Sequence, residues 1–272
     1  MTLTQPVHAL LDSLRSAAIY DLEQPRHADA PTFKAHQPGF VYRLHRRHEP
    51  DMGEARTSAS GIIITAEHSG THIDALCHIA ENMHLHGGRR VNPQIQTFTG
   101  FKELGVEAIP PMLARGILID IARHRGVDRL PPAVAVSADE LRAAAEAQGV
   151  SAAPGDVVLV RTGNGSQWHD PEEYLRGPGM SPEASEWLAG LDALAVGADN
   201  VAWDATEVVD ANRGNLPGHV ILLVRSGIYF LENLFLEELS ASGQNEFLFL
   251  CFPLKMVGVT GSPVRPVAVI PT

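Results

Sequence analysis

His68-Ser69-Gly70-Thr71-His72-Ile73-Asp74-Ala75-Leu76-Cys77-His78 places three histidines and one aspartate within eleven residues. A regular helix cannot direct His68, His72 and Asp74 inward together, and a strand does so only if it stays extended throughout. Gly70 permits a backbone bend that would bring the three side chains together. His78 follows Asp74 by four residues, so a helix beginning near Asp74 would set these two side by side.

Neutral imidazole and carboxylate are ligands that divalent transition metals prefer, so this stretch predicts a metal site. The alternative is a chance cluster of structural or solvated histidines, because the chain has 13 of them. His84 and His86, beside a glycine pair, are either further ligands or part of a polar loop, and we expect the loop. We expect the other histidines before residue 200 at ordinary surface, polar or solvated positions: His8, His27, His36, His45, His48, His124 and His169.

The composition argues against several classes of partner. A formal net charge of −11 disfavours a nucleic-acid groove, which needs a basic surface, and an anionic membrane surface. The longest apolar run, residues 246–254, is too short to span a bilayer, and residues 1–14 lack a secretory-signal pattern. Cys77 and Cys251 are expected as packed thiols rather than as a disulfide. We therefore expect a cytoplasmic location, with no nucleic-acid or membrane partner.

Strand and helix patterns interleave along the chain. Apolar and β-branched runs predict strands at residues 61–66, 116–121, 157–160, 194–196, 228–231, 246–253 and 264–270. Helices are expected at residues 7–19, 141–148, 181–189 and 219–225. Several strands follow one another without a helix between them, so the pattern predicts an α/β chain with a mixed sheet. The strand at 61–66 leads to His68, and we expect it to be buried and to support the ligands.

The string His68-x-Gly70-Thr71-His72-x-Asp74-x3-His78 resembles the signature of the cyclase family of metal-dependent hydrolases, which includes bacterial kynurenine formamidases and isatin hydrolases. The resemblance implies the swivelling β/β/α architecture in a single domain, residues 1–272. It also implies that His219 and Glu232 complete a site for one or two divalent ions, zinc or manganese. From the residues alone, Glu232 could equally be a capping or surface glutamate.

The chemistry of such a site follows from its ligands. His68, His72 and Asp74 supply three protein ligands and leave a position for water, which is typical of catalytic sites. A bound ion lowers the pKa of water to about 7. His78, whose ordinary pKa is about 6.5, is predicted to act as general acid and base. By resemblance, the enzyme hydrolyses the C–N bond of a small aromatic amide or lactam, such as N-formylkynurenine or isatin.

Two departures from the family pattern affect the expected substrate. The family's formamidases commonly carry proline between Asp74 and His78, where this chain has Ala75-Leu76-Cys77, and Trp203 stands where the family has a small polar residue. The aromatic residues expected near the substrate are Phe33, Phe40, Tyr42, Trp168 and Trp203. Two alternatives stay open: a lactone hydrolase or cyclase acting on a non-nitrogen substrate, and a catalytically silent metal-binding protein. We also expect a homo-oligomer, either a dimer or a tetramer.

Overall fold

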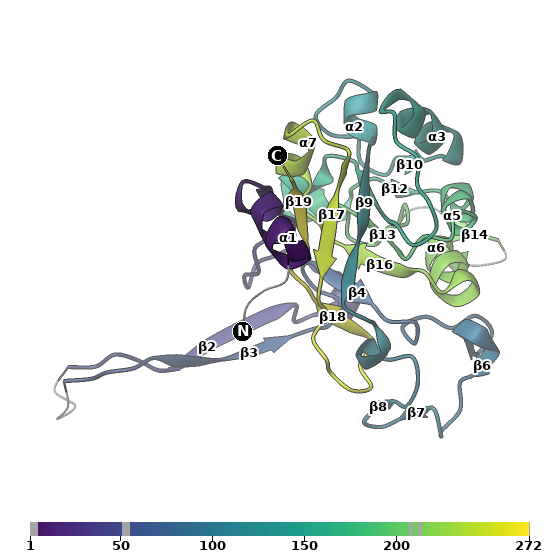
Figure 1. Cartoon of the computed structure of the whole chain (residues 1–272). Helices are drawn as coiled ribbons and strands as arrows, with labels where there is room; N and C mark the ends of the chain where they lie inside the picture. The colour runs from purple at the N-terminus through teal and green to yellow at the C-terminus, as the bar shows by residue number, and fades with distance from the viewer. Residues whose placement is uncertain (1–4, 51–54, 207–208, 212–213, 272) are drawn as a thin grey trace.

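A large mixed sheet carries most of the predicted ligands (Figure 1). The computed structural model describes residues 5–50, 55–206, 209–211 and 214–271. The sheet strands are β1 (Ala18–Asp21), β4 (His72–Asp74), β9 (Met112–Asp120), β11 (Val157–Arg161), β13 (Ala195–Ala198), β16 (Tyr229–Glu232), β17 (Glu246–Cys251), β18 (Gly261–Pro263) and β19 (Val267–Ile270). Within the described residues these nine pair in the order β1-β19-β17-β9-β11-β13-β16-β4-β18.

The pairing directions confirm the predicted mixed α/β class. β9, β11, β13 and β16 are parallel neighbours. The pairs β1–β19, β17–β19, β9–β17, β4–β16 and β4–β18 are antiparallel. Antiparallel pairing therefore places β4, which carries two of the predicted ligands, between β16 and β18.

Helices and short strands complete the chain. The helices are α1 (Gln5–Arg15), α2 (Ile121–His124), α3 (Ala138–Ala147), α4 (Pro171–Leu175), α5 (Pro182–Ala189), α6 (Pro217–His219), α7 (Glu237–Ala241) and a π-helix (Val220–Ser226). Single turns of 3-10 helix lie at Lys34–His36, His86–Gly88, Val106–Ala108 and Asn164–Gln167. The short strands pair as β2 (Phe40–Arg46) with β3 (Ser60–Thr65), β5 (His84–Leu85) with β6 (Arg89–Arg90), β7 (Gln96–Thr97) with β8 (Gly100–Phe101), β10 (Ala135–Val136) with β12 (Gly179–Met180), and β14 (Val209–Asp210) with β15 (Gly214–Asn215).

Both faces of the central strands are buried. Side chains of a strand alternate between its two faces. Val158 of β11 belongs to the same buried cluster as Leu141 of α3 and Leu188 of α5. Its neighbour Leu159 belongs to the cluster that contains Leu239 of α7. A parallel strand covered on both sides is apolar throughout, which is why residues 157–160 form a continuous apolar run.

The helix predicted at residues 7–19 was wrong at its C-terminal end. The helix ends at Arg15, and Ala18–Asp21 form the edge strand β1 instead. β1 pairs with β19, the last strand along the chain, which lies over 200 residues away in the sequence. Local apolar spacing cannot reveal such a long-range pairing, and here the backbone hydrogen bonds of the sheet outweigh helix propensity.

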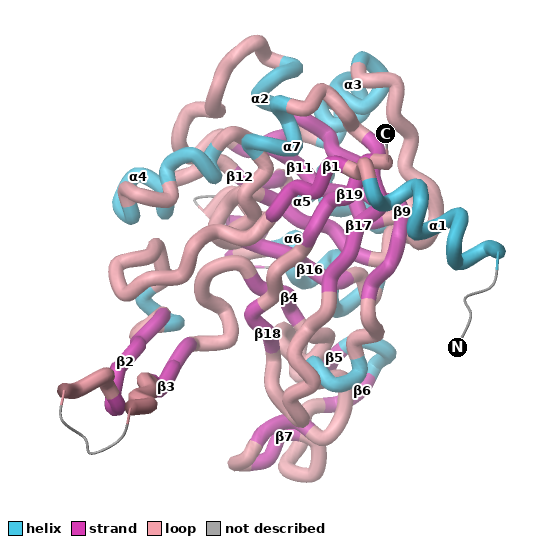
Figure 2. Tube along the Cα trace, turned by 60° about the vertical axis from the view of Figure 1, so that its left-hand side comes forward, coloured by secondary structure: helices cyan, strands magenta, loops and turns pink. Residues whose placement is uncertain are grey.

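The strand predicted at residues 61–66 forms, but the prediction that it is buried was wrong. Among the described residues β3 pairs only with β2, and the two make a ribbon that projects from the body (Figures 1 and 2). Ile62, Ile63 and Ile64 are each more than half exposed. We name residues 40–46 with 60–65 the β2–β3 arm. His68 is therefore held by the turn that follows the arm rather than by a buried strand.

Candidate metal centre

The core of the site is the pairing of β4 with β16. Residues two apart in a strand point to the same face, so His72 and Asp74 share one face of β4. The antiparallel register places Glu232 of β16 opposite His72. The His72 Nε2 atom lies 3.3 Å from Glu232 Oε2 and 3.4 Å from Asp74 Oδ1. Two segments 160 residues apart thus bring two carboxylates around one imidazole.

His68 reaches the same carboxylate from the turn between β3 and β4. Its Nδ1 atom lies 2.7 Å from Asp74 Oδ1. Gly70 adopts φ +59° in this turn, a left-handed conformation that favours glycine. A Cβ atom there would lie 2.7 Å from Arg26 Nη1. The bend that the sequence predicted at Gly70 is therefore present, and a side chain at this position would have to displace the Arg26 guanidinium.

His78 lies beside Asp74, although not through the helix that the spacing predicted. A turn, closed by a 2.9 Å hydrogen bond from His78 N–H to the Ala75 carbonyl, connects the two residues. His78 Nε2 lies 3.9 Å from Asp74 Oδ2, and its ring stacks on that of His68 with 3.8 Å between centroids. Its side chain is 19% exposed, against 7% for His68. His78 is thus more open to solvent than its neighbour.

His219 comes from the short helix α6, which precedes the π-helix. Its Nε2 atom lies 3.3 Å from Glu232 Oε1 and 3.7 Å from Asp74 Oδ2. The structure therefore brings His219 and Glu232 next to residues 68–78. The family resemblance implied that these two residues lie close to that stretch. A π-helix is a rare element that is often found at functional sites.

Three of the histidines share one arrangement: each uses one ring nitrogen for an outer partner and turns the other toward the carboxylates. His72 Nδ1 donates to the Gly70 carbonyl at 2.8 Å, which leaves Nε2 facing Asp74 and Glu232. His219 Nδ1 lies 2.8 Å from Asp204 Oδ2. In His68 the outer partner is the hydroxyl of Thr260, 2.8 Å from Nε2. Outer hydrogen bonds of this kind fix the tautomer of metal-binding histidines.

Asp204 has no signal in the sequence, because it precedes His219 by 15 residues and belongs to no motif. Its side chain is 1% exposed. One oxygen faces the His219 ring, and the other accepts the Gly218 N–H at 2.6 Å. Asp204 therefore holds both the backbone and the imidazole of the α6 turn.

The two central carboxylates retain buried oxygen atoms without a hydrogen-bond partner among the described residues. These atoms are Asp74 Oδ2 and Glu232 Oε1. Burying an unpaired carboxylate oxygen is costly unless a cation compensates it. In the part of the chain that the structure describes, two groups of residues each have their potential ligand atoms within 4.8 Å of one another: His68, Asp74 and His78, and His72, Asp74 and Glu232. The donors, imidazole and carboxylate, fit a divalent transition metal.

The charges of the site favour ionised carboxylates. Burial would raise the pKa of Asp74, but the surrounding histidines, His78 first, hold it well below its ordinary value. Burial also acts to raise the pKa of Glu232, but the imidazoles of His219 and His72, each 3.3 Å from one of its oxygens, lower it below its ordinary value. For His78, burial lowers the pKa to about 3, so its imidazole is neutral near pH 7. A neutral imidazole can accept a proton or a metal ion.

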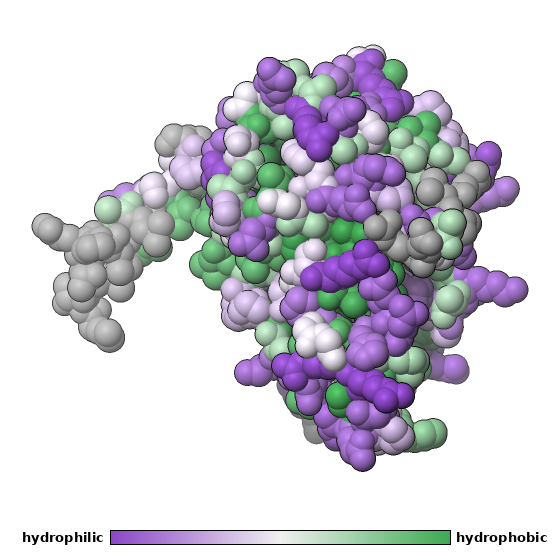
Figure 3. Space-filling view, turned by 90° about the vertical axis from the view of Figure 1, so that its right-hand side faces the viewer, coloured by the Kyte–Doolittle hydropathy of each residue, from purple (hydrophilic) through white to green (hydrophobic). Residues whose placement is uncertain are grey.

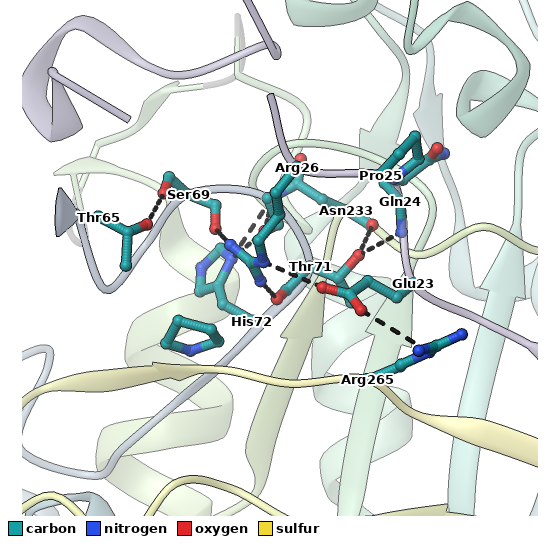
Figure 4. Close-up of polar contacts among 12 residues, drawn as sticks. Glu23, Gln24, Pro25, Arg26, Thr65, Ser69, Thr71, His72, Asn233 and Arg265 are labelled. Carbon is teal, nitrogen blue, oxygen red and sulfur yellow. Dashed lines mark hydrogen bonds and ion pairs between the residues drawn. The ribbon is translucent and has the colours of Figure 1, made fainter. Parts of the chain in front are cut away.

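Arg26 holds the turn that carries His68 and His72 (Figure 4). Its guanidinium donates to the carbonyl oxygens of Ser69 and Thr71. Glu23 accepts from Arg26 Nε at 3.0 Å, and burial lowers the pKa of the arginine. The carbonyl of Gly70, which lies between Ser69 and Thr71 in the chain, accepts a hydrogen bond from Asn233 Nδ2 at 3.0 Å. Three consecutive carbonyl groups are thus fixed, which sets the spacing of the two histidines.

Several other residues singled out in the sequence lie away from the cluster. His84 is exposed and bonds to the Asn82 carbonyl, and His86 Nδ1 lies 3.0 Å from the Val224 carbonyl, so neither joins the ligands. Cys77 is buried, and burial raises the pKa of its thiol to about 12, as expected of a packed residue.

The aromatic residues expected around a substrate are dispersed. Trp203 is fully buried against Phe230 and donates to Ser185 Oγ, so it does not face a substrate as we expected. Trp168 and Phe33 pack in a separate cluster. Phe40 and Tyr42 lie on the β2–β3 arm.

His36 was expected at an ordinary surface or polar position, and this was wrong. Its ring centroid lies 5.1 Å from that of His68. The residue is half-buried at the end of the 3-10 turn Lys34–His36. Its sequence neighbours give no motif that points to a site. His36 therefore lies beside the candidate site, a position that sequence reasoning missed.

Comparison with known proteins shows the family to which the chain belongs. The family model described as "Putative cyclase" matches residues 20–205. Cyclase-like protein 2 from Oryza sativa subsp. japonica is 27% identical over 204 residues, a match that covers 73% of this chain and 60% of the rice protein. An isatin hydrolase from Roseibium aggregatum is 26% identical over 217 residues, which covers 77% of this chain and 74% of that enzyme.

Solved structures share the fold over nearly the whole chain. The crystal structure of a novel cyclase superposes with a TM-score of 0.83 at 26% identity, covering 98% of this chain and 92% of that one. An isatin hydrolase bound to the product analogue thioisatinate gives a TM-score of 0.75 at 22% identity, with full coverage of both chains, and shows the likeness of fold alone. On the family match to residues 20–205, this chain belongs to the cyclase family.

Proposed function

We propose that this protein is a metal-dependent hydrolase that cleaves a C–N amide bond, in a formamide or a cyclic amide such as N-formylkynurenine or isatin. The observation that carries the proposal is the buried pair Asp74 and Glu232, surrounded by histidines, in which each carboxylate has an oxygen without a hydrogen-bond partner among the residues that the structure describes. The relationship to the isatin hydrolase from Roseibium aggregatum supports the choice of an amide in a small aromatic substrate.

In this proposal His68, His72, Asp74, His219 and Glu232 hold one or two divalent ions, zinc or manganese. Asp74 contacts His68 through Oδ1 and faces His219 through Oδ2, so its two oxygens would contribute to holding the bound metal on both sides of the carboxylate. When bound, a divalent ion supplies Lewis acidity toward water and toward the substrate carbonyl. The outer partners Thr260, Gly70 and Asp204 keep the ligating nitrogens pointed at the carboxylates.

His78 is the proposed general acid and base. It lies 3.9 Å from Asp74 Oδ2 and is less buried than His68, so its imidazole is placed to accept a proton from the attacking water. The same nitrogen then returns the proton to the departing amine nitrogen. Proton transfer by a positioned side chain contributes about 10²- to 10⁴-fold to the rate.

The test is hydrolysis by protein loaded with zinc or manganese on matched substrates: isatin, N-formylkynurenine and an aromatic lactone. We expect amide cleavage that a chelator abolishes and added metal restores, and that His78→Ala lowers strongly. Turnover of the lactone alone would instead support a lactone hydrolase. No turnover of any substrate, with metal bound, would support a silent metal-binding protein.

We also propose a homo-oligomer, a dimer or a tetramer, in which the β2–β3 arm contacts a second copy. An isolated two-stranded ribbon is marginally stable in water, and this one exposes Ile62, Ile63 and Ile64. Figure 3 shows the opposite face of the molecule, where hydrophilic and hydrophobic residues are mixed. Light scattering should give a mass above that of one chain, and Ile63→Asp should lower it.

A cytoplasmic location stays a prediction. Among the described residues there is no helix that is both long and apolar enough to cross a bilayer. The net charge of −11 continues to argue against a nucleic-acid partner.

A further inference from the structure

The carbonyl oxygen of Gly70 is shared by two donors, one of them the proposed ligand His72. His72 Nδ1 lies 2.8 Å from this oxygen and Asn233 Nδ2 lies 3.0 Å from it, with 3.5 Å between the two nitrogens. Figure 4 shows Asn233 beside the turn that carries Thr71 and His72. A carbonyl oxygen can only accept, so this arrangement keeps the His72 proton on Nδ1 and leaves Nε2 to face Asp74 and Glu232.

The amide of Asn233 must therefore present its nitrogen, and not its oxygen, to Gly70 and His72. The hydroxyl of Tyr174, on α4, donates to Asn233 Oδ1 at 2.9 Å. Within the described residues this oxygen has no other hydrogen-bond partner. Because Gly70 provides only an acceptor and Tyr174 provides a donor, the two partners together allow one orientation of the amide.

Both members of this contact are buried and held in place. Tyr174 is 0% exposed and Asn233 is 2% exposed, so solvent does not replace the hydroxyl. The Tyr174 ring packs edge-on against Trp168, with 4.9 Å between centroids, and its backbone carbonyl accepts from Asn164 Nδ2 at 3.1 Å. The Asn233 carbonyl accepts from Thr71 Oγ1 at 2.6 Å. The hydroxyl is thus fixed relative to the turn that carries the ligands.

We propose that Tyr174 is a positioning residue of the metal centre, which acts on His72 through Asn233. This inference rests on the proposed function, because it concerns how a metal ligand is presented. Without the hydroxyl, Asn233 Oδ1 would be buried and unpaired, which is costly, so the amide would turn. Its oxygen would then compete with the Gly70 carbonyl for the Nδ1 proton of His72, and the direction of Nε2 would change.

The experiment measures zinc affinity by competition with a chromophoric chelator for the wild type, Tyr174→Phe, Asn233→Gly and the double variant. Asn233→Gly removes the amide, and glycine readily adopts the φ of +57° at this position. Tyr174→Phe should lower zinc affinity about 3- to 10-fold, the value of one hydrogen bond. The double variant should bind zinc as tightly as Asn233→Gly alone, because Tyr174 then has no amide to orient.

A second measurement separates positioning from stability. The visible absorption of bound cobalt(II) depends on the geometry of its ligands, so Tyr174→Phe should shift this spectrum while the metal-free variant stays folded in thermal unfolding. Tyr229→Phe is the matched control, because Tyr229 is half-buried on β16, the strand that also carries Glu232. It should leave both the zinc affinity and the cobalt spectrum unchanged.

The inference is overturned if Tyr174→Phe binds zinc as tightly as the wild type, or if the losses of the two single variants add in the double variant. It is also overturned if Tyr229→Phe weakens zinc binding equally, or if metal-free Tyr174→Phe is unfolded at the assay temperature. A wild type that binds no zinc would contradict the proposed function itself. A wild type that binds zinc, with no effect of Tyr174→Phe, would contradict only this inference.

Discussion

Replacing Asp204 by asparagine tests how His219 is presented to the two carboxylates. The Asp204 carboxylate accepts from His219 Nδ1 at 2.8 Å and from Gly218 N–H at 2.6 Å, with the side chain 1% exposed. An asparagine would keep the bond to Gly218 and turn its amide N–H toward His219. The His219 proton would then move to Nε2, the nitrogen that faces Asp74 and Glu232.

Loss of an outer partner of a metal-binding histidine typically lowers metal affinity or activity by about 10- to 100-fold. A change of this size equals about 1.4–2.8 kcal/mol of binding free energy. We expect the metal affinity of Asp204→Asn to fall by an amount in this range. The asparagine amide would no longer accept the Nδ1 proton of His219, and the described residues provide no other acceptor for it. Folding is expected to persist, since the side-chain volume and the Gly218 hydrogen bond are retained.

The assay is competition between the metal-free protein and a chromophoric chelator for zinc or manganese, with thermal unfolding of the metal-free protein measured in parallel. Asp139→Asn serves as the control, because Asp139 is 94% exposed on α3. Metal affinity of Asp204→Asn within twofold of the wild type would refute the argument. A lowered affinity accompanied by unfolding of the metal-free variant would also count against it.

Two further substitutions test the geometry of the site. His78→Ala should keep the metal and lose about 10²- to 10⁴-fold in turnover; loss of metal, measured by elemental analysis, would show that His78 is a ligand. Gly70→Ala should cost about 1–2 kcal/mol of folding free energy for its left-handed φ of +59° and should also weaken metal binding. Gly126→Ala is the control, because Gly126 has φ +69° and open space around it. It should lower the folding free energy in a denaturant titration and leave metal affinity unchanged. Equal metal affinity of Gly70→Ala and Gly126→Ala would contradict the account.

The stretch at residues 68–78 could be predicted as a site because its chemistry is local. Its ligand types, the glycine bend and the four-residue spacing to His78 are all visible in the sequence. The helix expected after Asp74 was nevertheless wrong, since the chain forms a turn there. The central strands were also predictable, because burial on both faces gives continuous apolar runs such as residues 157–160.

What could not be predicted depends on contacts between distant segments. The cross-strand pairing of Glu232 with His72 is a matter of sheet register, and only the family resemblance pointed to Glu232. Asp204 and His36 reach the site through packing that leaves no local pattern. The exposure of β3 was missed for the same reason, because an apolar run does not reveal whether another layer covers it.

The most direct test of the metal centre is the number of metal equivalents bound by the purified protein and by His72→Ala. His72 Nε2 contacts both carboxylates, at 3.3 and 3.4 Å, so its loss should remove the central ligand. We predict that the wild type binds one or two equivalents of metal. Full activity after one equivalent is added to the metal-free protein would show that a second ion is not required. We predict a sharp loss of both metal and activity in His72→Ala. Full metal content with normal turnover in that variant would contradict the assignment.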